Sequence, residues 1–302
     1  MGLLARGGHA PVLITFMMGT SALIIGIMIN SLNGLVHLFG ILCWMLSAFF
    51  VNFWRDPDRK IPTDQGILVS PADGHVMFAR REKATGRRPS SKELEDPKIE
   101  QDSLTGTWFP SPLDNPLLFS TEQRFESVSD GEESDDDVWR IAIFMSPLDV
   151  HVNRSPCEAI IERMEHRVGK GRRRGPFLPA MKKESENNER VRTVFLSKQG
   201  FRIEVCQISG ALARTIVPWL SIDAEVRRGQ RYGMIRLGSR VDIRVPANLF
   251  KPAVVSAEDG NSQFPRVNLY KLELQYYSKV LAINRIGGLK HRTVSEMLGG
   301  VL

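Results

Sequence analysis

One dipeptide of the sequence, Gly238-Ser239, combines residue types that could act on their own peptide bond. Glycine carries no side chain, so it lets the backbone distort and leaves its carbonyl open to approach. A serine hydroxyl with a base beside it can attack that carbonyl from within its own chain. The dipeptide alone indicates little, because a Gly-Ser turn between strands is usually structural. The interpretation therefore depends on a base and on the surrounding motifs.

Two further polar turns contain candidates for proton transfer. Residues 70–75 (SPADGH) contain Asp73 and His75, and residues 146–154 (SPLDVHVNR) contain His151. The sequence has no H-E-x-x-H zinc motif, no P-loop and no G-x-S-x-G elbow. The common metal, nucleotide and hydrolase chemistries are therefore not indicated, and we expect no metal site.

These turns interrupt β-like runs. Residues 66–79 predict two strands joined by a turn, and residues 138–152 predict a strand that runs into the second polar turn. Weaker helical signals lie at 210–220 and 269–286. We therefore expect an α+β fold with a β-rich catalytic domain. Further strands are predicted at residues 191–196, 201–211, 232–237 and 241–245.

The beginning of the chain predicts a transmembrane helical hairpin. Residues 7–54 contain no Lys, Arg, Asp or Glu. Within them, residues 11–29 and 35–53 are each apolar and long enough to span a bilayer as a helix. Residues 30–34 (NSLNG) supply the polar, turn-forming link between the two helices. The alternative is a buried hairpin in a soluble core, which the missing charges disfavour.

Basic residues flank the hairpin on both sides. Arg6 precedes it, and Arg55, Arg59 and Lys60 follow it. Because positively charged flanks stay on the cytoplasmic side of a membrane, both ends of the hairpin are expected there. The sequence thus predicts a protein of the cell (inner) membrane whose catalytic domain lies on the cytoplasmic face.

Composition sets broader bounds. A chain of 302 residues with 42% hydrophobic and 25% charged residues is long enough for a real core, and wholesale disorder is excluded. A net charge of +6 does not by itself indicate nucleic acid, and we expect none as a partner. Residues 82–137 differ from the rest, with several prolines and the acidic run DGEESDDD. They predict an exposed, partly disordered insertion.

Taken in order, the motifs of the chain resemble those of phosphatidylserine decarboxylase proenzymes, specifically the shorter, membrane-anchored form. The resemblance covers roughly residues 53–246, apart from the acidic insertion. The segments that carry it are 53–59 (FWRDPDR), 71–74 (PADG), 144–154 (FMSPLDVHVNR), 175–180 (GPFLPA), 188–190 (NER), 207–214 (QISGALAR) and 228–240 (RGQRYGMIRLGSR).

The resemblance implies a chain that cuts itself between Gly238 and Ser239. The products would be a β chain of residues 1–238 and an α chain of residues 239–302, and Ser239 would become a pyruvoyl group, the covalent cofactor. That group would form a Schiff base with phosphatidylserine in the membrane, which would yield phosphatidylethanolamine and CO2. The α and β chains of one precursor would stay together, and a homo-oligomer is left open.

The resemblance also assigns roles to single residues. Asp73, His151 and Ser239 would form an Asp-His-Ser arrangement like that of serine proteases. His151 would be the base for the Ser239 hydroxyl, and it is also a candidate proton donor after decarboxylation. Some relatives of the longer form have a second histidine three residues later, where this chain has Arg154. His75 is therefore kept as a reserve base.

These inferences divide the chain into three parts. Residues 1–54 are the anchor, residues 55–246 are the pyruvoyl-dependent decarboxylase domain with its insertion at 82–137, and residues 247–302 are a divergent C-terminal extension. Two alternatives to the main function stay open. One is a pyruvoyl decarboxylase for a soluble amino acid, and the other is a non-catalytic, membrane-tethered binding module that keeps the fold but is never cut.

Overall fold

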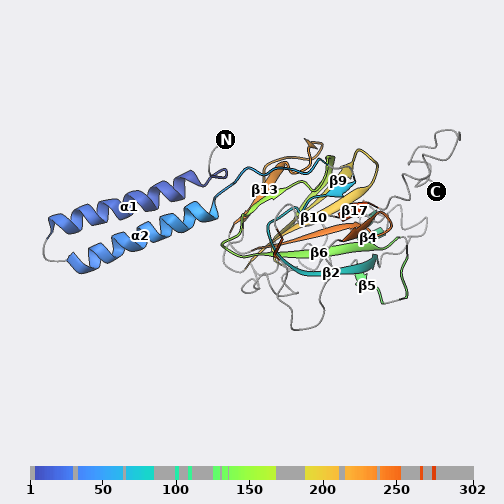
Figure 1. Cartoon of the computed structure of the whole chain (residues 1–302), viewed down its shortest axis with the longest axis horizontal. Helices are drawn as coiled ribbons and strands as arrows, with labels where there is room; N and C mark the ends of the chain where they lie inside the picture. Colours follow the sequence, from blue (N-terminus) through green and yellow to red (C-terminus); the bar gives the residue numbers. More distant parts are fainter. Residues whose placement is uncertain are drawn as a thin grey trace.

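A hairpin of two long helices projects from one end of a β-rich domain (Figure 1). This arrangement confirms the predicted fold class. The structure is a computed structural model. It describes residues 4–29, 33–63, 66–84, 99–101, 108–110, 125–129, 131–134, 136–167, 188–210, 215–236, 239–252, 266–267 and 274–276.

The hairpin consists of α1 (His9–Met28) and α2 (Asn33–Phe53). The helices can approach closely because two glycines face each other. A Cβ atom at Gly19 would lie 2.9 Å from the carbonyl oxygen of Gly40, and one at Gly40 would lie 3.0 Å from that of Gly19. Small residues at such contacts are typical of helices that pack in membranes. Both helices are long and apolar enough to cross a bilayer, and most of their large apolar side chains are exposed, which supports membrane association.

Antiparallel pairing links the strands of the main sheet in the order β12-β8-β9-β10-β14-β6-β2-β16, and β5 pairs with β2 as a ninth strand. The bounds of these strands are β2 (Gly74–Ala84), β5 (Phe125–Ser127), β6 (Val138–Met145), β8 (Ala159–Arg167), β9 (Arg190–Ser197), β10 (Arg202–Ser209), β12 (Glu225–Val226), β14 (Ser239–Pro246) and β16 (Arg266–Val267).

Three smaller sheets complete the β structure of the described residues. One contains β11 (Thr215–Pro218), β13 (Arg231–Arg236) and β7 (Val152–Arg154). Another contains β1 (Ile67–Leu68), β17 (Leu274–Tyr276) and β15 (Phe250–Pro252), and the last pairs β3 (Ile99–Gln101) with β4 (Trp108–Pro110).

The main sheet is buried on both faces, and the two faces differ in chemistry. Side chains alternate along a strand, so Val241, Ile243 and Val245 of β14 share one face and Arg240, Asp242 and Arg244 the other. The apolar face packs against the sheet of β7, β11 and β13, and the rings of Phe195 and Tyr232 meet edge to face between the two layers, with centroids 5.3 Å apart. This interlayer space is the hydrophobic core.

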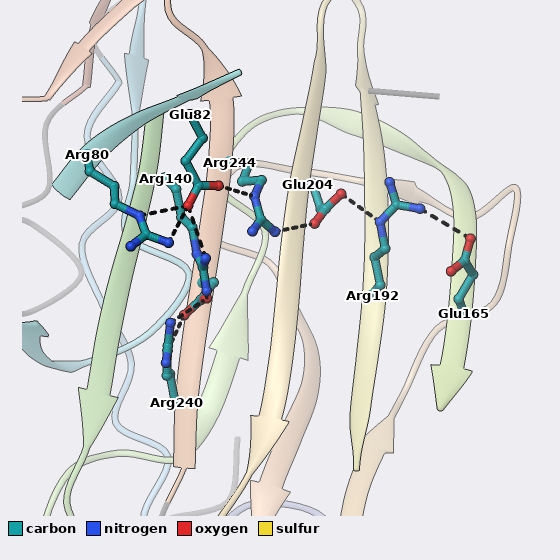
Figure 2. A network of polar contacts seen from close by, with 9 residues as sticks. Arg80, Glu82, Arg140, Glu165, Arg192, Glu204, Arg240 and Arg244 are labelled. Atoms are coloured by element: carbon teal, nitrogen blue, oxygen red, sulfur yellow. Dashed lines mark hydrogen bonds and ion pairs between the residues drawn. The ribbon is translucent and has the colours of Figure 1, made fainter. Parts of the chain in front are cut away.

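The opposite face carries a chain of buried ion pairs that runs across β2, β6, β14, β10, β9 and β8 (Figure 2). Glu204 illustrates the pattern, because its carboxylate accepts from Arg192 at 2.6 Å on one side and from Arg244 at 2.8 Å on the other. Alternating signs let each buried charge meet an opposite one, which offsets the cost of removing them from water. The members of the network are Arg80, Glu82, Arg140, Glu165, Arg192, Glu204, Arg240, Asp242 and Arg244.

Glu82→Gln is expected to destabilise the domain by about 3–5 kcal/mol and to lower the Tm by ~10 °C. The carboxylate of Glu82 is 1% exposed and pairs with Arg80, Arg140 and Arg244, so its loss leaves buried guanidinium groups short of a counter-charge. Thermal unfolding followed by tryptophan fluorescence measures the change. Glu158→Gln is the control, because Glu158 is 56% exposed and water screens its pair with Lys198, which therefore contributes little to stability. Equal shifts in the two variants would contradict the prediction.

The same network predicts a loss of stability in acid. Burial alone would raise the pKa of Glu82 and of Asp242, but the neighbouring arginines outweigh it and lower each pKa to about 2. A carboxylate whose pKa is lower in the folded than in the unfolded chain stabilises the fold. This contribution is fully present at a pH above the pKa of the unfolded chain, and it is lost as the pH falls toward the pKa of the folded chain. The Tm of the wild-type domain should therefore decrease between about pH 4.5 and pH 2, and a Tm that stays constant there would contradict this prediction.

The predicted strands at 191–196, 201–211, 232–237 and 241–245 correspond to β9, β10, β13 and β14 and are confirmed. The helical predictions at 210–220 and 269–286 are wrong where the structure describes them, because residues 215–218 form β11 and residues 274–276 form β17. In β11 the β-branched sequence Thr-Ile-Val pairs with β13, and such residues favour strands. The remaining residues of both segments lie outside the described part.

The predicted insertion and the predicted C-terminal extension both contain residues that take part in the sheets. Glu82 belongs to β2 and Asp137 is buried, so both ends of the insertion lie in the folded domain. Its strand β5 pairs with β2, and the ring of Phe125 lies 4.4 Å from the guanidinium carbon of Arg244. In the extension, β16 pairs with β2 and β17 pairs with β1. Both segments contribute strands because free sheet edges remain for them to pair with.

Candidate functional site

Ser239 is the first residue of β14 and lies on the apolar face of the main sheet. It pairs with Met145 of β6 on one side and with Ser209 of β10 on the other. The side chain is fully buried, and its hydroxyl donates to the sulfur of Met145 at 3.3 Å. This is a weak hydrogen bond, so little holds the hydroxyl in place. Gly238 lies outside the described residues.

A buried pair of amides connects the two layers beside Ser239. The amide nitrogen of Gln207 on β10 donates to the side-chain oxygen of Asn153 on β7 at 2.8 Å. Asn153 in turn donates to the carbonyl of Pro71, in the first polar turn, at 3.4 Å. Gly233 of β13 allows this approach, because a Cβ atom there would lie 3.2 Å from the Gln207 nitrogen. Residues from three of the motifs therefore meet next to the serine.

His151 immediately precedes β7 and is fully buried. Its Nδ1 lies 2.9 Å from the backbone carbonyl oxygen of Asp149. A carbonyl oxygen only accepts hydrogen bonds, so Nδ1 carries the proton and Nε2 presents a lone pair. Nε2 has no hydrogen-bond partner among the described residues. Burial lowers the pKa of His151 to about 4, and therefore the imidazole is neutral near pH 7. This is the form that a general base requires.

The turn before His151 is fixed by Asp149. The backbone nitrogen of Ser146 donates to the Asp149 carboxylate at 2.9 Å, and the hydroxyl of Ser146 donates to the same oxygen at 2.7 Å. This closed turn sets the position of the carbonyl that orients the imidazole. Sequence reasoning did not single out Asp149, although an aspartate three residues after a serine is a common turn signal.

The backbone places His151 and Ser239 at the same end of the domain. The amide of Ile235 donates to the carbonyl of His151 at 3.3 Å, and Ile235 lies only four residues before Ser239 in the chain. Met145, which pairs with Ser239, lies six residues before His151. Two short connections therefore link the regions of the serine and the histidine, one through Ile235 and one through Met145.

The chain is similar in sequence to a known protein family. A sequence model described as phosphatidylserine decarboxylase matches residues 46–263, which include every residue of the site described above. The chain belongs to the phosphatidylserine decarboxylase family.

Relatives with the name phosphatidylserine decarboxylase proenzyme include one from Streptomyces griseus, which is 46% identical over 68% of this chain and 66% of its own length. One from Thermobifida fusca is 45% identical over 43% of this chain and 59% of its own length. One from Symbiobacterium thermophilum is 33% identical over 67% of this chain and 71% of its own length. The first two matches thus span somewhat less than two thirds of those relatives.

In this member of the phosphatidylserine decarboxylase family, Asp73 lies in the turn before β2. The turn requires the glycine that follows, because Gly74 has a φ of +153° and a Cβ atom there would lie 2.2 Å from the carbonyl oxygen of Phe144. The carboxylate of Asp73 pairs with Arg59, and His151 makes no hydrogen bond to it. The structure thus places Asp73 near the site without joining it to the imidazole, and its assigned role stays a prediction.

The other two residues discussed in the sequence, Arg154 and His75, lie elsewhere than beside the Ser239 hydroxyl. Arg154 extends to the segment after the hairpin, where it pairs with Asp56 at 2.9 Å. His75 pairs in register with Phe144, and Phe144 pairs with Arg240. Directly paired residues share a face, so His75 lies on the face of the sheet opposite to Ser239. This placement favours His151 over His75 as the base.

The hairpin joins the domain at the end where β13 lies (Figure 1). Phe53 and Trp54, at the end of α2, form a buried apolar cluster with Val150, Val152 and Met234, which flank the site in β7, β13 and the turn before them. The helices that support membrane association therefore also contact the residues around His151.

Proposed function

We propose that the chain is a self-processing phosphatidylserine decarboxylase of the cell (inner) membrane, with its β-rich domain on the cytoplasmic face. The observation that carries the proposal is the buried serine at the start of β14, at the same end of the domain as a neutral histidine whose Nε2 is unpartnered among the described residues. That arrangement occurs in a chain whose family relatives bear the name proenzyme. The Asp73, His151 and Ser239 set of the family motifs is complete in this sequence.

The first reaction is self-cleavage at Gly238-Ser239. His151 takes the proton of the Ser239 hydroxyl, whose oxygen then bonds to the Gly238 carbonyl carbon while the peptide C–N bond breaks. The proton passes to the Ser239 nitrogen, which gives an ester and a free amine. Loss of the Ser239 α-proton then breaks the bond between Cβ and Oγ and releases residues 1–238 with a C-terminal carboxylate. One water enters and one ammonia leaves, and position 239 becomes a ketone next to an amide carbonyl.

The residues around position 239 fit such a group. The hydroxyl of Ser209, the amide oxygen of Gln207 and Nε2 of His151 are buried and have no hydrogen-bond partner among the described residues. A buried polar atom without a partner costs roughly 1–3 kcal/mol, so these atoms are suited to bind polar groups of a substrate. A pyruvoyl group at position 239 would supply an electron sink for the pair of electrons left when CO2 departs.

The protein side chains would then orient the substrate and move protons. Ser209 is paired with Ser239, and Gln207 is held by Asn153, so both are rigidly placed beside the reacting position. His151 can return a proton from Nε2 to the substrate carbon after CO2 has left. The apolar core on the same face excludes water, which strengthens each of these polar contacts.

The hairpin favours a lipid substrate over a soluble amino acid. Two membrane-spanning helices at the same end as the site keep the site beside a bilayer, where phosphatidylserine resides. Arg6 precedes the hairpin and Arg55, Arg59 and Lys60 follow it, which supports the cytoplasmic side for the domain. A soluble substrate gives no reason for such an anchor.

An intact-mass spectrum of the detergent-solubilised protein tests self-cleavage. We expect two chains that meet at residues 238 and 239, with the smaller chain lighter by one ammonia than the same sequence with an N-terminal serine. A single chain of 34.0 kDa would contradict the proposal and favour the non-catalytic, membrane-tethered module. Release of labelled CO2 from carboxyl-labelled phosphatidylserine in vesicles, compared with free labelled serine, then tests the substrate. Release from free serine alone would favour a decarboxylase of soluble amino acids.

A further inference from the structure

The end of membrane helix α2 makes direct contact with the histidine of the site. We propose that Phe53, together with Arg55 just after it, positions the imidazole of His151 for proton transfer, so that the membrane anchor forms one wall of the active site. The proposal rests on the function proposed above, in which His151 moves protons. Phe53 and Arg55 are positioning residues, because they act through His151.

The contact between the two rings is close and buried. The ring centroids of Phe53 and His151 are 4.4 Å apart, with an angle of 45° between the ring planes. Phe53 is 2% exposed and His151 is fully buried. The phenyl ring therefore covers one side of the imidazole and keeps water away from it.

A second contact joins the same end of α2 to the active-site turn. One guanidinium nitrogen of Arg55 donates to the carbonyl of Leu148 at 2.6 Å, while the other donates to the carbonyl of Asn52, in the last turn of α2, at 2.8 Å. Leu148 and His151 lie on either side of Asp149, whose carbonyl orients the imidazole. The helix end therefore holds the turn from both sides of the orienting residue.

These contacts restrict the orientation of the His151 imidazole, which its own hydrogen bond does not fix. Among the described residues, the imidazole of His151 has a single hydrogen bond, through Nδ1, and one hydrogen bond does not fix the plane of a ring. The phenyl ring of Phe53 restricts that plane and so sets the direction of the Nε2 lone pair. Two charged groups act on the imidazole: Asp149 favours its protonated form, and Arg55 disfavours it. Burial is the largest effect, and together with Arg55 it outweighs Asp149 and keeps the pKa of His151 low.

A role in packing alone makes a different prediction from a positioning role. If Phe53 only fills space, its replacement lowers stability and leaves the pH dependence of the reaction unchanged. If it shields and orients the imidazole, its replacement admits water, and the pKa of His151 rises toward the ordinary value of about 6.5. The pH profile of self-cleavage therefore separates the two roles.

The experiment measures self-cleavage of the full chain, made by cell-free synthesis into lipid nanodiscs, between pH 4 and pH 8. The wild-type rate should stay nearly constant down to about pH 5. For Phe53→Leu, the rate at pH 5.5 should be about tenfold lower than at pH 8, because an imidazole with a pKa near 6.5 is then mostly protonated. Phe49→Leu is the matched control, since Phe49 packs on Phe53 with centroids 6.3 Å apart but makes no ring contact with His151. It should keep the wild-type profile.

A folded Phe53→Leu chain with the wild-type pH profile would overturn the proposal. If that variant does not accumulate as folded protein, Arg55→Gln decides, because it breaks the bond to Leu148 and removes the cation that disfavours imidazolium. Its acid limb should move to higher pH, and an unchanged limb would overturn the proposal. A wild-type chain that is never cut at any pH would instead refute the proposed function, so the two failures are distinguishable.

Discussion

Ser239→Ala is expected to leave one uncut chain of 34.0 kDa with no decarboxylase activity. In the proposed reaction, the hydroxyl of Ser239 is both the attacking group in self-cleavage and the source of the oxygen that leaves with the β chain, so no other atom can replace it. The loss should be complete, because the serine lies buried between Met145 and Ser209 and alanine fills the same position without strain. Gel electrophoresis and intact mass measure the first effect, and CO2 release from labelled phosphatidylserine measures the second.

Ser197→Ala is a suitable control for this experiment. Ser197 is also a buried serine of the main sheet, but it is the last residue of β9. Since β9 and β14 run in the same direction, Ser197 lies at the opposite end of the strands from Ser239, the first residue of β14. Its replacement should leave the cut and the activity in place. A Ser239→Ala chain that is cut at the wild-type position would refute the assignment of the nucleophile, whereas loss of cutting in both variants would point to general misfolding.

The strands that position the site could be predicted because their alternation is local. Residues 239–246 (SRVDIRVP) alternate polar and apolar side chains, which indicates a strand in any context. The same pattern normally indicates one face in water, and here the structure differs. Arg240, Asp242 and Arg244 are buried, because Asp242 pairs with Arg240 in the same strand and charges on the neighbouring strands pair with Asp242 and Arg244. Pairing across strands depends on the order of strands in the sheet, and a single sequence does not reveal that order.

The sequence predicts candidate members of the site but not the contacts that those residues make. The motifs identify Ser239, His151 and Asp73, and the structure brings their three turns to one end of the domain. Sequence spacing does not show that Asp73 pairs with Arg59, or that the imidazole is oriented by a backbone carbonyl. Both facts depend on tertiary geometry.

Phe53 shows the same limit more clearly. In the sequence it is one of many apolar residues in a predicted membrane-spanning helix, and although it opens the motif of residues 53–59, nothing there indicates a contact with a histidine. It lies 98 positions before His151, so their contact leaves no local signal. The role of a residue at the boundary between anchor and domain follows only from the packing of the two parts.

His151→Asn is expected to slow self-cleavage by about 10²- to 10⁴-fold near pH 7, the usual contribution of a general base. Asparagine can keep a hydrogen bond to the Asp149 carbonyl through its amide nitrogen, but it offers no basic nitrogen to the Ser239 hydroxyl. The rate of cutting after cell-free synthesis into nanodiscs measures the effect. His166→Asn is the control, because His166 has a 52% exposed side chain and bonds to Glu189, so cutting should proceed at the wild-type rate.

The same substitution should also lower the rate of decarboxylation per molecule of protein that is eventually cut. Nδ1 of His151 is bound to the Asp149 carbonyl, so Nε2 is the one nitrogen free to exchange protons in either reaction. A single atom would then serve first as base for the serine and later as donor to the substrate carbon, and one substitution should affect both steps. If His151→Asn were cut at the wild-type rate and failed only to release CO2, the histidine would act in the second step alone. The processing base would then have to be found elsewhere, even though His75 lies on the opposite face of the sheet.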